Sequence, residues 1–359
     1  FQLDASSARN QSVKLRVSAA GFDSFPSGIR RSLPINLSGA VDMGAVLVLS
    51  SLLTEVILEP LANPAGLGSI AGQVEGGAAL VIAEGPVVES TISNADGEYV
   101  LFNLTPGSYE VQAYVAGRQF TPAAATVLAD QQTPDVNLVS SGQALGSVSG
   151  SVNIVNAPGG SATSVVLVVA STFNEVTARG DVPPGLRAPT VGSPNVTGPF
   201  TISGVPSGTY KVLAAFENDG LVRDPDTNIA GTQIVEVTVE GGAVSLPESF
   251  KITEALAVIS PGAGDEPTQI TGTPTLVWAD DSSEDYYSVE VFDSSGNIVW
   301  SDPLVPGVSG SSTVSVAYGG PALQSGRTYQ FRATSWRDSG GDARPISITE
   351  DLRGVMSVL

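Results

Sequence analysis

Residues 99–115 read YVLFNLTPGSYEVQAYV, and residues 200–216 read FTISGVPSGTYKVLAAF, so the chain contains nearly the same sequence twice. Apolar and polar residues alternate in YEVQAYV and YKVLAAF, which is typical of a β-strand with one buried face. The TPG and PSG triplets just before these strands favour a turn, because proline presets φ and glycine accepts positive φ. Each segment is therefore expected to place a turn before a half-buried strand that starts near a shared tyrosine, Tyr109 or Tyr210.

The similarity extends upstream of these segments. The two copies open with GSIAGQV at 68–74 and GSVSGSV at 146–152, and NADGEY at 94–99 carries the Asp-Gly pair that favours a β-hairpin. The openings are 78 residues apart but the tyrosine segments are 101 apart, so the second copy holds about 23 extra residues. These lie near 173–198, a Pro- and Gly-rich stretch that predicts a long loop. Long loops on rigid scaffolds often carry function, and a spacing insertion is at least as good an interpretation.

A GxIxGxV strand, an Asp-Gly hairpin and a strand with Gly-x-Tyr-x-Val together resemble the carboxypeptidase regulatory-like family. The resemblance covers residues 68–140 and 146–253, and the second copy departs from it because NVTGPF replaces the Asp-Gly turn. It implies two small transthyretin-like β-sandwiches that serve as non-catalytic spacers or adhesive units in secreted and surface proteins.

Residues 255–359 have a different pattern, which resembles a fibronectin type III-like sandwich. Trp278 is placed as the core tryptophan, and Leu323, Gly326 and Tyr329 have the spacing of a tyrosine corner. Tyr287 also fits a core position. A carbohydrate-binding surface is the alternative for the aromatic residues, and the three expected to face outward are Tyr286, Tyr318 and Trp336.

The first 60 residues look like the closing half of a repeat. VKLRVSAAG at 13–21 aligns with YEVQAYVAG at 109–117, and the apolar run at 45–58 is too short to span a bilayer and is interpreted as buried strands. Half a sandwich cannot cover its own apolar face. The missing strands could precede Phe1, the segment could close on itself, or a neighbouring subunit could supply strands in trans. In the last case FQLDASSARN at 1–10 is the natural donor and ITEDLRGVMSVL at 348–359 the natural acceptor edge.

Composition excludes several classes of function. The chain has no His and no Cys, which excludes Ser-His and Cys-His nucleophile pairs, thiolate zinc sites and disulfides. Its formal net charge is −20, which argues against binding to nucleic acid or anionic membranes. No phosphate-binding loop or catalytic pair stands out, so the chain is predicted not to be an enzyme and to need no cofactor.

One weak metal site is predicted. Asp224, Asp226 and Asn228 occur at alternate positions, a spacing at which oxygen ligands can surround Ca²⁺. No EF-hand glutamate or turn glycine accompanies them, and a solvated turn is the more ordinary interpretation. The acidic run at 280–285 is expected to be an exposed loop.

The sequence thus predicts an all-β, rod-like chain of tandem Ig-like or transthyretin-like β-sandwiches. The expected parts are 1–66 (a partial or strand-completed sandwich), 67–143 and 144–254 (regulatory-like sandwiches, the second with the insertion) and 255–359 (fibronectin type III-like). The favoured function is a secreted or bacterial cell-surface scaffold, adhesin or filament subunit, with head-to-tail self-association by strand complementation or with surface proteins or polysaccharide as partners. No nucleic acid partner and no transmembrane segment are expected. The alternative is a set of carbohydrate-binding accessory modules of a secreted enzyme.

Overall fold

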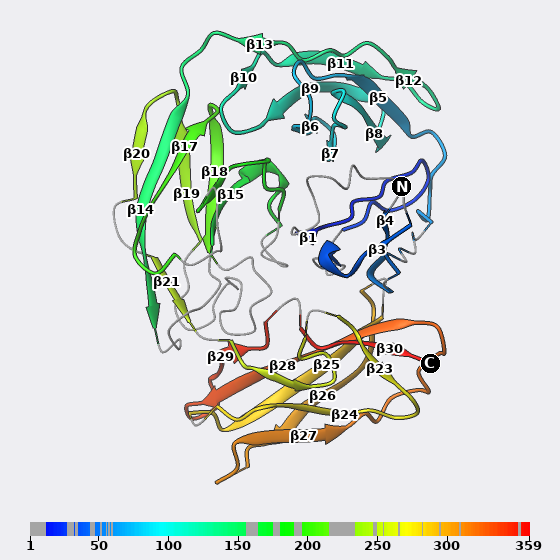
Figure 1. Ribbon diagram of the computed structural model, residues 1–359, viewed down its shortest axis with the longest axis vertical. Helices are drawn as coiled ribbons and strands as arrows, with labels where there is room; N and C mark the ends of the chain where they lie inside the picture. Colours follow the sequence, from blue (N-terminus) through cyan, green and yellow to red (C-terminus); the bar gives the residue numbers. More distant parts are fainter. Residues whose placement is uncertain are drawn as a thin grey trace.

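The computed structural model describes most of the chain. The residues it describes are 12–26, 32, 35–43, 47–50, 52–54, 56, 58, 60–155, 164–174, 180–189, 196–214, 234–246, 250–253, 255–264, 266–281, 283–293, 296–308, 310–350 and 353–359. Within these ranges the regular elements are β-strands and three 3₁₀ turns, Leu37–Gly39, Leu52–Thr54 and Ala170–Thr172 (Figure 1). The all-β prediction is confirmed.

The first repeat is a two-sheet sandwich. One sheet has the order β12-β5-β8, and the other has the order β11-β9-β6-β7. A short pair, β10 with β13, lies beside them. The bounds are β5 Gly68–Gln73, β6 Leu80–Glu84, β7 Val88–Ile92, β8 Glu98–Leu104, β9 Gly107–Tyr114, β10 Gln119–Phe120, β11 Ala123–Val127, β12 Gln132–Thr133 and β13 Ser140–Ser141.

The second repeat has the same topology. Its sheets run β20-β14-β17 and β19-β18-β15-β16, with β21 also paired to β14. Because β16 occupies the place of β7 and lies within residues 173–198, the described part of the predicted long loop supplies a sheet strand. The bounds are β14 Gly146–Val155, β15 Val165–Val169, β16 Arg187–Ala188, β17 Pro199–Val205, β18 Gly208–Ala214, β19 Val235–Val239, β20 Ala243–Ser245 and β21 Phe250–Thr253.

The duplicated sequence forms the crossing from one sheet to the other. In each copy the first strand (β8 or β17) belongs to one sheet and the second (β9 or β18) to the facing sheet. The shared tyrosine fixes this crossing, because the Tyr109 hydroxyl donates to the Thr105 carbonyl at 2.8 Å and the Tyr210 hydroxyl donates to the Pro206 carbonyl at 2.8 Å. The two segments are alike because both must make the same corner.

The predicted Asp-Gly hairpin is wrong, although a tight turn does form there. The Asn94 side chain accepts hydrogen bonds from the backbone N–H groups of Asp96 and Glu98, and Gly97 adopts φ 88°. However, β7 and β8 on either side pair with strands of different sheets. Buried Ser93 accounts for the separation, since its hydroxyl accepts from the Ala79 N–H at 2.9 Å and so holds the end of β7 on the β6 side.

The glycines of the opening phrase are required by close packing. A Cβ on Gly72 would lie 2.0 Å from the Val136 carbonyl oxygen, whereas a Cβ on its counterpart Gly150 would lie 2.7 Å from the end of the Leu246 side chain. The Val136 carbonyl also accepts the Tyr99 hydroxyl at 2.6 Å, so it is not free to move.

We therefore expect Gly72→Ala to lower the free energy of unfolding by about 1–3 kcal/mol, the usual cost of overpacking a core. Gly150→Ala is the matched control and should cost less, because the new methyl group meets the side chains of Leu246 and Phe200, which can shift, and not a fixed backbone carbonyl. Urea denaturation followed by circular dichroism measures both. Equal losses in the two variants would contradict the expectation.

The C-terminal sandwich is built from the orders β22-β24-β27 and β23-β30-β28-β25-β26, with β29 paired to β28. Trp278 is fully buried among its strands, and Gln324 N–H donates to the Tyr329 hydroxyl at 3.1 Å, as in a tyrosine corner. The bounds are β22 Val258–Ser260, β23 Thr268–Ile270, β24 Thr275–Ala279, β25 Tyr286–Asp293, β26 Ile298–Pro306, β27 Thr313–Ala317, β28 Thr328–Asp338, β29 Ala343–Ile348 and β30 Val355–Val358.

The predicted acceptor edge at the C-terminal end is wrong. The strand β30 pairs with β23 on one side and with β28 on the other, so its backbone is already bonded within the same sheet. A strand from another molecule could not add there without displacing β23.

The N-terminal segment is not a half-sandwich in its described residues. It contains two short pairs, β1 (Ser12–Val13) with β2 (Ile35–Asn36) and β3 (Val41–Asp42) with β4 (Leu47–Val48). VKLRVSAAG is therefore not a sheet strand like β9. The expectation of buried strands at 45–58 is also wrong, since none of the residues whose burial is described there is buried and Val48 is 50% exposed. A buried strand needs a second sheet packed on its apolar face. The described N-terminal residues instead lie against the first repeat.

A shared core joins the two repeats. The strand β6 is buried on both faces: Val81 and Ala83 face the core of the first repeat, and Leu80 and Ile82 belong to the core of the second. The rings of Tyr114 and Tyr210 meet edge to face at 6.2 Å across this junction. Backbone N–H groups also donate across it, from Ala116 to the Pro184 carbonyl, from Gly117 to the Gly204 carbonyl, and from Ser207 to the Gln119 side chain.

Candidate functional site at a three-segment junction

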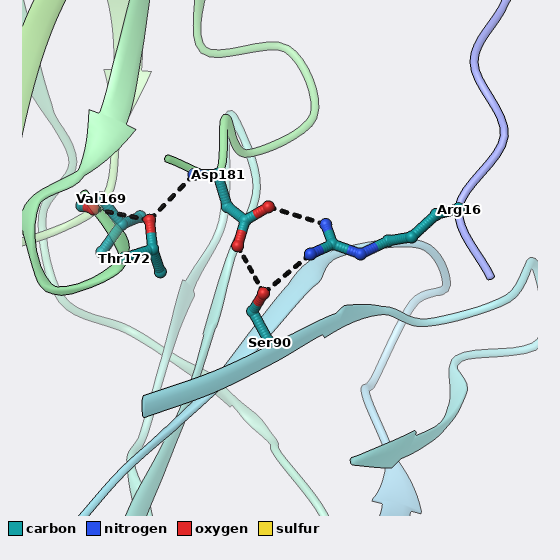
Figure 2. A network of polar contacts seen from close by, with 5 residues as sticks. All are labelled: Arg16, Ser90, Val169, Thr172 and Asp181. Atoms are coloured by element: carbon teal, nitrogen blue, oxygen red, sulfur yellow. Dashed lines mark hydrogen bonds and ion pairs between the residues drawn. The ribbon is translucent and has the colours of Figure 1, made fainter. Parts of the chain in front are cut away.

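Three segments far apart in sequence meet at one polar cluster (Figure 2). Arg16 of the N-terminal segment donates to Asp181 at 2.7 Å and to the Ser90 hydroxyl at 2.8 Å. The Ser90 hydroxyl, on β7, in turn donates to the other carboxylate oxygen of Asp181. The N-terminal segment, the first repeat and the insertion of the second repeat are thus tied together by one closed ring of hydrogen bonds.

Asp181 is itself held in place by the second repeat. Its backbone N–H donates to the Thr172 hydroxyl at 2.8 Å, and that hydroxyl donates to the Val169 carbonyl at the end of β15, also at 2.8 Å (Figure 2). The second repeat thus fixes the backbone of Asp181, and the Ser90 hydroxyl of the first repeat helps to orient its carboxylate toward Arg16. The side chains of Arg16 and Asp181 are only 24% and 21% exposed, which reduces screening of the pair by solvent.

Asn103 holds the neighbouring stretch of the N-terminal segment. Its side-chain oxygen accepts from the Gly21 N–H at 2.8 Å, and its side-chain nitrogen donates to the carbonyls of Ala19 and Phe22 at 3.3 and 2.8 Å. Asn103 has a φ of 63°, a conformation that asparagine tolerates better than most residues. One side chain therefore bonds three backbone groups of this stretch and holds it on the first repeat.

A cavity of about 290 Å³ lies between the N-terminal segment and the first repeat. Glu89, which precedes Ser90 on β7, lines it together with Asp23 from the opposite side. Burial raises the pKa of Glu89 to about 7, and the negative charges of Asp181 and Asp23 act in the same direction, while Arg16 opposes them. The other lining residues are Ser24, Leu61, Ala62, Asn63, Leu67 and Asn103.

The predicted calcium ligands cannot be placed at this junction. Asp224, Asp226 and Asn228 lie outside the described residues, and within the described ranges no three carboxylates are arranged to hold a metal ion. The acidic run at 280–285 is tied down in its described part, because the Tyr287 hydroxyl accepts from Asp281 N–H at 2.6 Å and donates to Asp280 at 2.9 Å.

The aromatic residues divide as predicted with one exception. Trp278, Tyr287 and Tyr329 are buried, and the rings of Tyr286 and Trp336 are partly exposed and stack in parallel, with centroids 6.1 Å apart. Tyr318, which was expected to face outward, is 5% exposed because its ring packs on Trp300 and its hydroxyl donates to the Pro321 carbonyl.

Sequence reasoning missed the residues of the junction. It singled out the 173–198 insertion, in which Asp181 lies, but no local pattern distinguishes Arg16, Glu89 or Ser90 from other surface residues. A contact between residues 165 positions apart leaves no periodic signal.

The chain matches no protein-family model and no curated protein sequence. Among solved structures, its fold is similar to the Bacillus anthracis TIE protein, at 11% identity and a TM-score of 0.21 over 82% of this chain and 49% of that one. It is also similar to a Streptococcal ancillary pilin, at 11% identity and a TM-score of 0.19 over 82% and 98%. A third is BcpA, the major pilin subunit of Bacillus cereus, at 12% identity and a TM-score of 0.16 over 79% and 95%. The chain spans about half the length of the TIE protein chain, and likeness at this level assigns no function.

Proposed function

We propose that this chain is a non-catalytic structural protein of the cell exterior, a scaffold or adhesin that works through its surfaces. The observation that carries the proposal is the shared core between the repeats, in which Leu80, Ile82 and Tyr114 of the first repeat are buried with the second. Interfaces between freely moving domains are usually small and polar. An apolar junction reinforced by hydrogen bonds instead favours a stiff unit, which suits a protein that holds partners at a fixed separation.

The proposal also includes an assignment of the individual domains. We infer carboxypeptidase regulatory-like sandwiches at 67–143 and 144–254, a fibronectin type III-like sandwich at 255–359, and an N-terminal part at 1–66. Tyrosine corners in all three sandwiches support these assignments. Within the described residues no helix is long and apolar enough to cross a membrane.

Self-association by strand addition needs an acceptor other than β30. The strand β26 ends the larger sheet of the C-terminal sandwich and pairs, within the described residues, only with β25. It exposes Ile298 and Leu304, which are 55% and 65% accessible, whereas Pro303 limits how far a new strand could pair. The predicted donor, residues 1–10, lies outside the described residues.

The proposal predicts where the protein is found and in what form. Antibodies against the chain should label intact cells of its source organism, and extracted material should hydrolyse none of a panel of polysaccharides and peptides. Multimers of one subunit mass in that extract would support self-association. Antibody access only after the cells are broken open, or turnover of any substrate in the panel, would overturn the structural role.

One observation favours the carbohydrate-binding alternative. Parallel, partly exposed rings such as those of Tyr286 and Trp336 are surfaces on which sugar rings can pack. Affinity electrophoresis in polysaccharide gels separates the two functions: retardation that Trp336→Ala abolishes would favour a carbohydrate-binding module, and unchanged mobility in every gel would favour the scaffold.

A further inference from the structure

The three-segment junction combines the hydrogen-bonded Arg16 with more carboxyl groups than this one cation can neutralise. Arg16 is held by Asp181 and Ser90, and Glu89, next to Ser90 on β7, lines a cavity together with Asp23. The charged or titratable groups that interact with Glu89 are Arg16 and Asp23 from the N-terminal segment, Asp181 from the insertion and Tyr109 from β9. A single cation in this group therefore faces three carboxyl groups.

The charge on the Glu89 carboxyl group depends on whether the N-terminal segment is in place. When the segment is docked, its cavity wall reduces the exposure of Glu89 to bulk water and brings Asp23 close, and both effects disfavour the ionised carboxylate, whereas Arg16 of the same segment favours it. The described residues provide Glu89 with no hydrogen bond that would offset this loss of hydration. When the segment leaves, Glu89 regains water and loses the repulsion from Asp23.

We propose that the junction is a pH-sensitive latch, in which the N-terminal segment stays docked on the first repeat in mildly acidic medium and is released as Glu89 ionises. The inference concerns the chain alone and does not depend on the surface role proposed above.

The direction in which docking depends on pH follows from proton linkage. In the docked state the pKa of Glu89 is raised from its ordinary 4.5 to about 7, mainly by burial, and undocking removes the part of that burial which the cavity wall of the segment supplies. Docking is therefore fully favoured below the ordinary pKa of a glutamate, and this contribution is lost as pH rises through about 7. The charge of Arg16 acts in the opposite direction and reduces the effect, and burial remains the largest cause of the shift.

The chain has no cysteine, so two can be introduced for specific spin labelling. Ala20 of the N-terminal segment and Ala95 of the first repeat are both exposed, and Ala20→Cys with Ala95→Cys in the full chain reports the distance between them. Pulsed electron paramagnetic resonance should give a narrow distance distribution at about pH 5.5 and a broad, longer one at about pH 8.5.

Glu89→Gln imitates the protonated side chain and should keep the distribution narrow at both pH values. Glu110→Gln, an exposed glutamate on β9, is the matched control and should behave like the parent chain. Arg16→Gln should give the broad distribution at both pH values, which proves that release is detectable. Identical narrow distributions in the parent chain at both pH values, or an unchanged transition in Glu89→Gln, would overturn the latch.

Discussion

Ile82→Ala is expected to lower the free energy of unfolding of the two repeats by about 2–5 kcal/mol, the usual cost of removing a buried aliphatic side chain. Ile82 is fully buried, and it belongs to the core of the second repeat although it lies on a strand of the first. The cavity left by the substitution therefore lies at the junction and weakens both sandwiches together. Thermal unfolding followed by far-ultraviolet circular dichroism measures the loss.

Two controls make this result specific. Ile92→Ala removes the same atoms from the neighbouring strand β7, where the side chain is 43% exposed, and should change stability by less than about 0.5 kcal/mol. All three tryptophans lie in the C-terminal sandwich, so tryptophan fluorescence reports that domain alone and should show an unchanged transition in Ile82→Ala. Equal losses for Ile82 and Ile92 would mean that the shared core does not join the repeats.

Trp278→Ala is expected to destabilise the C-terminal sandwich by about 3–5 kcal/mol. The ring packs against Tyr287 and Phe331 at centroid distances of 5.5 and 6.4 Å, and it fills the centre of that core. Urea denaturation followed by the fluorescence of Trp300 and Trp336 measures the loss. Circular dichroism of the two repeats should change little, because the described core residues around Trp278 are separate from theirs.

The indole N–H of Trp278 allows the loss of the aromatic ring to be separated from the loss of the N–H group. It is buried and has no hydrogen-bond partner within the described residues, a state that costs free energy. Trp278→Phe removes this N–H while keeping an aromatic ring, so it should cost clearly less than Trp278→Ala. A phenylalanine variant as unstable as the alanine variant would mean that indole shape, and not burial of an aromatic ring, decides the packing.

Patterns within a few residues predicted the fold well. Alternating apolar residues located β9 and β18, and the shared tyrosines marked the two corners, because both signals come from contacts within the strand or its turn. The Asp-Gly pair predicted a turn correctly and a hairpin incorrectly. Turn residues fix the local backbone. The sheet that each flanking strand joins depends on contacts with residues outside the turn, such as the hydrogen bond from Ala79 N–H to Ser93.

The junction could not be predicted for the same reason. Its members have ordinary neighbours in sequence, and their role comes only from the way the repeats fold against each other. The N-terminal segment shows the opposite failure: its likeness to β9 predicted a long strand, but its described residues form only short pairs and isolated bridges and are held by Asn103 and Asp181. Sequence similarity to a strand predicts a strand only when a partner strand is present.

The ring formed by Arg16, Ser90 and Asp181 also sets an order of events during synthesis. Arg16 and Asp181 are separated by 165 residues, and ribosomes add roughly 5–20 residues per second. Some 10–30 seconds therefore pass between the emergence of the arginine and that of its carboxylate partner. During that interval Asn103 can already bind the N-terminal segment, but the arginine lacks its carboxylate partner and is open to other contacts of the nascent protein.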